Sequence, residues 1–218
     1  MAVRSFVFTL GFHEDFAIRR LTSKAAQKGE PILVFTAKPA VGAVQKAFNS
    51  LREFCRRVGL EEPSLTELDL SNGPRALVEA RTLMGQLPGL LVVDVSGGLR
   101  AVVVVTILAL LALGRDYELY AASETGAGFE LHLPAGVAKA LSRLSEEKRL
   151  ILAELARSPG LTVEGLAKRL KRAPKTVRNH LAELKKAGLI AVRGKGELEL
   201  TSWGRAIAGA PGSGRESG

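Results

Sequence analysis

The chain has 218 residues, of which 46% are hydrophobic and 24% are charged, and this balance excludes a mainly disordered protein. Cys55 is the only cysteine, which excludes disulfide scaffolds and cysteine-based structural zinc sites and fits a reducing, cytoplasmic compartment. The net charge of +9 lies entirely in the second part of the chain, because residues 1–134 carry 14 Lys and Arg against 14 Asp and Glu, whereas residues 135–218 carry 17 against 8.

Short apolar strands alternate with helical stretches in the first 134 residues. We expect strands at residues 3–9, 31–36, 65–70, 90–95, 117–122 and 129–133. We expect helices at residues 15–28, 41–58, 75–87 and 99–113. Repeated strand–helix units predict an α/β fold with a Rossmann-like, mostly parallel sheet that ends in a hairpin. No signal peptide is visible and the longest apolar run, 101–113, is shorter than the roughly 20 residues of a membrane span, so we expect no membrane contact.

The turn after the fourth expected strand, residues 94–100, is the first candidate binding site. Gly97 and Gly98 at the start of a helix let backbone amides approach a ligand, and free N–H groups there attract anions. Ser96 can donate a hydrogen bond, and Arg100 can pair with phosphate. The alternative is that the two glycines serve only close packing of strand and helix.

The turns after the first two strands lie at the same edge of the sheet if the strand order is 3-2-1-4-5. The glycine fingerprint of dinucleotide-binding sheets is missing after the first strand, which argues against a nicotinamide-dependent dehydrogenase. We expect neither a metal nor a cofactor. The candidate ligand-binding residues at these turns are Leu10, Gly11, Phe12, Thr36, Ala37, Lys38, Val95, Ser96, Gly97, Gly98 and Arg100.

The basic second part is expected to begin with a linker at residues 135–145. Three helices follow at residues 146–157, 162–170 and 174–188, and then two short strands at 189–193 and 197–201 enclose a Gly-rich turn. This order resembles a winged helix-turn-helix domain over residues 146–208, and residues 209–218 are typical of a disordered tail.

The third of these helices has an apolar stripe and an opposite polar face, as a recognition helix does. The positive charge of this region predicts contact with double-stranded DNA, although the same charges could solvate a helical surface, and a winged helix can also serve protein contacts alone. The candidate DNA-binding residues are Arg172, Lys175, Thr176, Arg178, Asn179, Arg193 and Lys195.

The Asp-x-Ser-x-x-x-Arg pattern of residues 94–100 resembles the signature of the CARF (CRISPR-associated Rossmann fold) domain. Gly11-Phe12 and the segment 124–128 are similar to that family as well, whereas His13 departs from its usual Asp or Asn. With the winged helix behind it, the chain resembles the archaeal CRISPR-associated CARF-domain transcription regulators over residues 2–208.

The resemblance implies that residues 1–134 form a homodimer that binds a cyclic oligoadenylate, with cyclic tetra-adenylate as the expected ring. It adds Glu124 and Gly126 to the ligand-binding residues and implies control of CRISPR genes as the output. Two alternatives remain. A CARF domain can be a metal-independent ring nuclease, for which Ser96 and Lys38 are candidates, but no general base is evident and we assign no catalytic residue. A purely structural DNA binder would show no ligand-dependent change.

Overall fold

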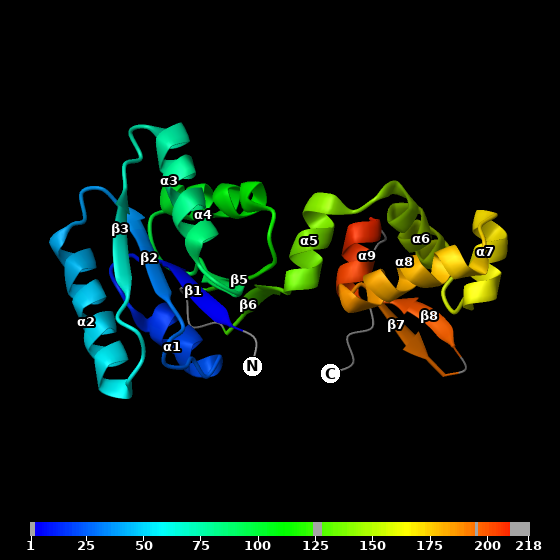
Figure 1. Ribbon diagram of the computed structural model, residues 1–218, viewed down its shortest axis with the longest axis horizontal. Coiled ribbons are helices and arrows are strands. Elements are labelled where there is room, and N and C mark those ends of the chain that lie inside the picture. The colour runs from blue at the N-terminus through cyan, green and yellow to red at the C-terminus, as the bar shows by residue number, and fades with distance from the viewer. Residues whose placement is uncertain (1–2, 124–127, 195, 210–218) are drawn as a thin grey trace. The chain divides into compact units, whose positions relative to one another are not determined.

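The computed structural model describes residues 3–123, 128–194 and 196–209, and the chain divides into two compact units, Met1–Leu133 and Pro134–Gly218 (Figure 1). Among the residues singled out from the sequence, Glu124, Gly126 and Lys195 lie outside the described residues, as does the expected tail from residue 210 onward.

The first unit is an α/β domain built on a six-stranded sheet of order β3-β2-β1-β4-β5-β6 (Figure 1). The strands are β1 (Arg4–Thr9), β2 (Ile32–Ala37), β3 (Ser64–Leu68), β4 (Leu90–Asp94), β5 (Tyr117–Ala122) and β6 (Glu130–Leu133). The first five are parallel, and β6 runs antiparallel to β5. The Rossmann-like sheet with a terminal hairpin that the sequence predicts is therefore confirmed.

Four helices connect the parallel strands. They are α1 (Asp15–Ser23), α2 (Gly42–Val58), α3 (Gly73–Gln86) and α4 (Arg100–Leu113). Phe6 and Phe8 of β1 are fully buried and pack with α1 and α2 on one face of the sheet. Right-handed crossovers place α3 and α4 on the opposite face. The central strands are covered on both faces, which explains why β1, β2 and β4 read as nearly continuous apolar runs.

Helix α1 ends at Ser23, five residues earlier than the predicted helix 15–28. Ala25 has a left-handed backbone, with φ 46°, and turns the chain away from the helix axis. The guanidinium of Arg4 donates to the carbonyl oxygens of Lys24 (2.8 Å) and Ala25 (3.3 Å), which have no helical partner. The apolar spacing continues past this point, so a contact made 20 residues away in the sequence sets the boundary.

The second unit consists of a helical cluster and a two-stranded wing (Figure 1). Its elements are α5 (Ala135–Arg143), α6 (Glu146–Arg157), α7 (Val163–Leu170), α8 (Pro174–Lys186), β7 (Ile190–Arg193), β8 (Glu197–Leu200) and α9 (Ser202–Ala208). β7 and β8 pair antiparallel, and Leu161 forms an additional bridge to Leu198. The predicted winged helix-turn-helix is confirmed.

The segment expected to be a linker, residues 135–145, contains helix α5 and belongs to the second unit. A Cβ atom on Gly136 would lie only 2.5 Å from the Cα of Ala187, just beyond α8, so the two segments meet backbone to backbone. This close packing explains why the segment is helical rather than extended. None of the helices in the described ranges is long and apolar enough to cross a membrane.

Candidate functional site

A cleft of about 810 Å³ opens at the carboxyl edge of the sheet in the first unit. It lies where β1, β2 and β4 end and where α1, α2 and α4 begin. The strand order reverses between β1 and β4, and open α/β sheets bind their ligands at such a switch point. The position of the cleft therefore agrees with the edge that the sequence indicates.

Most of the predicted ligand-binding residues that the structure describes meet this cleft. Those that line it are Leu10, Gly11, Phe12, Thr36, Ala37, Gly97 and Gly98. Lys38 and Arg100 are exposed but are not part of the lining, and Val95 and Ser96 are buried behind it. Ser96 and Lys38, the candidates for a cleavage reaction, are therefore both outside the cleft wall.

Further lining residues, not among those predicted from the sequence, come from the beginning of α1 and α2 and from the loops and helix caps at this edge. The additional lining residues are His13, Asp15, Phe16, Arg19, Pro39, Val41, Val44, Leu99 and Ser123. The signal for some of them was present, because Asp15 and Arg19 are four residues apart and so share one side of α1. The predicted set came from the turns alone, without the residues that follow them in α1 and α2.

The two glycine-containing turns touch each other through their backbones. A Cβ atom on Gly11 would lie 2.9 Å from the backbone nitrogen of Gly98, and one on Gly97 would lie 3.1 Å from the carbonyl oxygen of Thr9. Gly98 also has a φ of +90°, which disfavours any residue with a side chain. Close packing alone therefore requires glycine at positions 11, 97 and 98. Because these residues have no side chains, their backbone remains exposed to the cleft.

Substituting Gly98 with Ala tests this constraint on the cleft wall. We expect Gly98→Ala to lower the free energy of unfolding by about 1–3 kcal/mol, because its methyl group would press on Thr9 and Leu10 and the backbone would be strained. Gly42→Ala is the matched control, since nothing lies within 4 Å of its position and its φ is not in the left-handed region. Urea denaturation of both variants measures the difference, and equal stability of the two would contradict the assignment.

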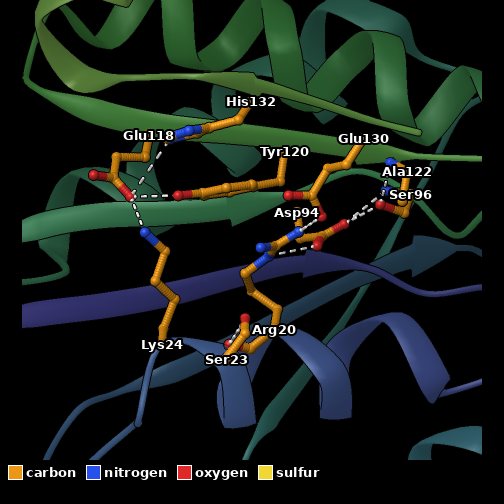
Figure 2. Close-up of polar contacts among 10 residues, drawn as sticks. All are labelled: Arg20, Ser23, Lys24, Asp94, Ser96, Glu118, Tyr120, Ala122, Glu130 and His132. Atoms are coloured by element: carbon orange, nitrogen blue, oxygen red, sulfur yellow. Dashed lines mark hydrogen bonds and ion pairs between the residues drawn. The ribbon is translucent and has the colours of Figure 1, made fainter. Parts of the chain in front are cut away.

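Hydrogen bonds within a buried polar cluster fix the conformation of the 94–98 turn (Figure 2). The backbone nitrogen and the hydroxyl of Ser96 both donate to Oδ1 of Asp94, and the hydroxyl accepts from the backbone nitrogen of Ala122 at 2.8 Å. The Ser96 hydroxyl therefore positions the turn and does not point a donor into the cleft. Nε of Arg20 donates to Oδ2 of Asp94 at 2.9 Å, and Nη2 of Arg20 donates to Glu130.

Burial favours loss of the Arg20 charge, but the hydrogen bonds to Glu130 and Asp94 outweigh it and raise the pKa of Arg20 above its ordinary value. The Arg20–Asp94 pair is almost fully inaccessible, with side-chain exposures of 7% and 2%. A charge buried to this degree requires a partner, so the two side chains depend on each other.

The cleft combines exposed apolar surface with groups that favour anions. Phe12 is 62% exposed and Leu99 is 59% exposed, although both are large apolar side chains. The guanidinium of Arg19 lies 4.9 Å from the centre of the Phe16 ring. The N-terminus of α4 begins at this wall and carries a partial positive charge. The part of the chain that the structure describes has no cluster of three or more His, Cys, Asp or Glu that could hold a metal ion.

The second candidate surface is the polar face of α8 in the second unit. Val177, Leu181 and Leu184 are buried in the domain core, as the apolar stripe predicts. Four of the predicted DNA-binding residues are exposed along the opposite face, and Arg172 is exposed just before the helix begins. The four are Lys175, Thr176, Arg178 and Asn179.

Two of the predicted DNA-binding cations have acidic neighbours. Nη2 of Arg178 lies 2.8 Å from Oε1 of Glu164 in α7, and Nε of Arg193 lies 3.0 Å from Oε2 of Glu199 in the wing. Both pairs are largely exposed, so each contributes little to stability. The arrangement keeps the cations extended over the surface without burying them.

The fold and the two surfaces define a class of protein: a Rossmann-like domain with a cleft at its switch point, followed by a winged helix-turn-helix. Residues 4–134 match the family described as the Csa3 CRISPR-associated Rossmann-like domain, and residues 145–192 match the arsR family of bacterial regulatory proteins. The first match spans more than half of the chain, so the protein belongs to the Csa3 family of CRISPR-associated regulators with a helix-turn-helix.

One relative agrees with this assignment in sequence. The chain is 28% identical over 204 residues to Csa3 of Saccharolobus solfataricus, named for its CRISPR locus and an inferred DNA-binding role, and the match covers 93% of this chain and 86% of the relative. Among solved structures, Can2 of Sulfobacillus thermosulfidooxidans, in complex with cyclic tetra-adenylate, is 12% identical with a TM-score of 0.43 and coverages of 94% and 61%. A MarR-family protein of Mycobacterium tuberculosis in complex with DNA is 33% identical with a TM-score of 0.29 and coverages of 35% and 62%. The chain thus spans less than two thirds of these solved structures, and the family assignment rests on the sequence matches.

Proposed function

We propose that this protein is a transcription regulator that senses a cyclic oligoadenylate in the cleft of its first unit and binds double-stranded DNA with its second. The observation that carries the proposal is the open cleft over the Gly11 and Gly98 turns at the switch point, in a chain with a helix-turn-helix. Cyclic tetra-adenylate is the proposed ligand, and the residues that line the cleft are the proposed binding residues.

The chemistry of the cleft suits a nucleotide ring. Its volume lies within the range of small-ligand sites, about 300–1,000 Å³. Exposed Phe12 and Leu99 offer apolar surface to bases, whereas Arg19 and the start of α4 offer positive charge to phosphates. Backbone N–H groups at the glycine turns can approach a ligand closely because no side chains cover them.

Isothermal titration with cyclic tri-, tetra- and hexa-adenylates tests the ligand. We expect cyclic tetra-adenylate to bind most tightly, and Arg19→Ala to weaken it about tenfold through the loss of a charged hydrogen bond. Arg57→Ala is the matched control, because this exposed arginine on α2 is not part of the cleft. Failure of all three rings to bind would overturn the proposal, and linear products after incubation would favour the ring nuclease instead.

We also propose that the protein forms a homodimer and that the exposed apolar face of α4 is the dimer interface. No charged residue occurs between Arg100 and Arg115. Val104, Leu108 and Leu111 are spaced by four and three residues and remain 54%, 46% and 45% exposed. An apolar stripe of this kind on a folded unit indicates a protein contact. A second copy is the proposed partner, since an isologous contact places two identical clefts around one axis, as a symmetric ring requires.

Light scattering on the full chain tests this surface. We expect a dimer for the wild type and a monomer for Leu108→Glu, because the carboxylate would be buried without a partner at the interface. Val58→Glu serves as the control, since Val58 is similarly exposed but lies at the end of α2, on the opposite face of the sheet. A monomeric wild type at micromolar concentration, or a dimeric Leu108→Glu variant, would refute the assignment.

DNA binding is assigned to the exposed face of α8 and to the cations around it. In a helix-turn-helix, the N-terminal residues of this helix meet base edges, while neighbouring cations contact phosphates. Arg178 and Asn179 are therefore the proposed base-reading residues, and Arg172, Lys175 and Arg193 the proposed phosphate contacts. Thr176 can serve either role. We propose Lys195 by its position in the sequence alone.

Fluorescence anisotropy with a duplex selected by the protein from a random pool distinguishes these roles. We expect Arg178→Ala to lose about 1–3 kcal/mol of sequence discrimination. Arg172→Ala should weaken binding to all DNA sequences alike and reduce the slope of log affinity against log salt concentration by about one. Arg56→Ala, on α2 of the first unit, is the control. Binding that is independent of salt would contradict this assignment.

A further inference from the structure

Helix α1 contacts both the cleft and the β5–β6 hairpin, and it uses different side chains for each. Asp15, Phe16 and Arg19 at its start line the cleft. Arg20 and Lys24, at the end of the helix and four residues apart, reach the hairpin (Figure 2). A displacement of the helix by anything bound in the cleft therefore acts directly on these two cations.

Arg20 bridges the turn at the cleft and the last strand of the sheet. Its Nε donates to Asp94, which holds Ser96 of the turn, and its Nη2 donates to Glu130 of β6. Its guanidinium also lies 3.6 Å from the centre of the Tyr120 ring, on the strand between them. One side chain thus joins α1 to β4, β5 and β6.

The second cation reinforces the contact with the hairpin. Nζ of Lys24 donates to Oε2 of Glu118 at 2.7 Å, and the Tyr120 hydroxyl donates to the same oxygen at 2.8 Å. The Tyr120 ring in turn stacks on His132 of β6, with the ring centres 4.3 Å apart. Ion pairs and stacked rings therefore link α1 to the two strands.

Strand β6 leads directly into the second unit. It ends at Leu133, and Pro134 caps helix α5, which packs against the residues following the recognition helix. Strand and helix adjoin in the sequence, with β6 ending at Leu133 and α5 beginning at Ala135. This is the covalent route between the two units.

We propose that the bridge from Asp94 through Arg20 to Glu130 couples occupancy of the cleft to the DNA-binding unit. The proposal rests on the proposed ligand function and specifies its regulation. A ligand that contacts α1 or the 94–98 turn favours one arrangement of the Arg20 bridge, and Glu130 passes that arrangement to β6. Loss of Glu130 would uncouple the two units and leave the cleft itself unchanged, because Glu130 is not part of its lining.

The test measures the affinity for a selected duplex with and without saturating cyclic tetra-adenylate, together with ligand affinity by titration. We expect a change of about 5–150-fold in duplex affinity for the wild type, the usual range of coupling between sites. Glu130→Gln should bring this factor close to one while ligand affinity is retained. Arg20→Lys, which keeps the charge but lacks the fork that holds two carboxylates, is the second variant and should lower the factor as well.

Glu62→Gln is the matched control, because Oε1 of Glu62 lies 3.9 Å from Nε of Arg52 in the same unit, just before β3 at the sheet edge opposite the hairpin. It should keep the wild-type factor. Equal factors for wild type and Glu130→Gln would overturn the coupling role and leave the ligand function standing. A wild type that binds ligand but shows no change in duplex affinity would overturn it too. A wild type that binds no ligand would refute the proposed function, and the coupling role with it.

Discussion

The hydrogen bonds accepted by the buried carboxylate of Asp94 are the interactions on which the cleft of the first unit depends. One oxygen accepts from the backbone and hydroxyl of Ser96, and the other accepts from Arg20. These contacts fix the turn after β4 relative to α1, which brings the turn into backbone contact with Gly11. Because Asp94 and Arg20 are both buried, removing the Arg20 charge would leave Asp94 without its cation, at a typical cost of about 3–5 kcal/mol, whereas removing the Asp94 charge would leave Arg20 paired with Glu130 alone. The cleft wall is therefore built on a buried ion pair and two glycine turns.

The two units differ in net charge and in the kind of surface that they offer to a ligand. The neutral first unit offers a concave site with apolar walls, and the second carries the entire +9 charge on a fold whose recognition helix keeps its polar face exposed. The same second unit includes α5, which begins directly after Pro134.

The sequence could predict the features that depend on local pattern. Alternating strands and helices gave the sheet and its order, and the apolar stripe of Val177, Leu181 and Leu184 gave the recognition helix. The predicted Gly97 and Gly98 of the 94–100 turn line the cleft, whereas Val95, Ser96 and Arg100 do not. The end of α1 could not be predicted, since it depends on Arg4 from another strand. The role of the Ser96 hydroxyl was equally hidden, because its acceptor is Asp94 and its donor comes from Ala122, 26 residues away.

The central claim is that one molecule binds a cyclic oligoadenylate and DNA and that the two events influence each other. Calorimetric titration of cyclic tetra-adenylate into the protein, alone and saturated with its selected duplex, tests this most directly. Thermodynamic linkage requires DNA to change ligand affinity by the same factor by which ligand changes DNA affinity. The account predicts tight binding with a dissociation constant that differs between the two titrations. Identical constants in the two titrations would contradict it.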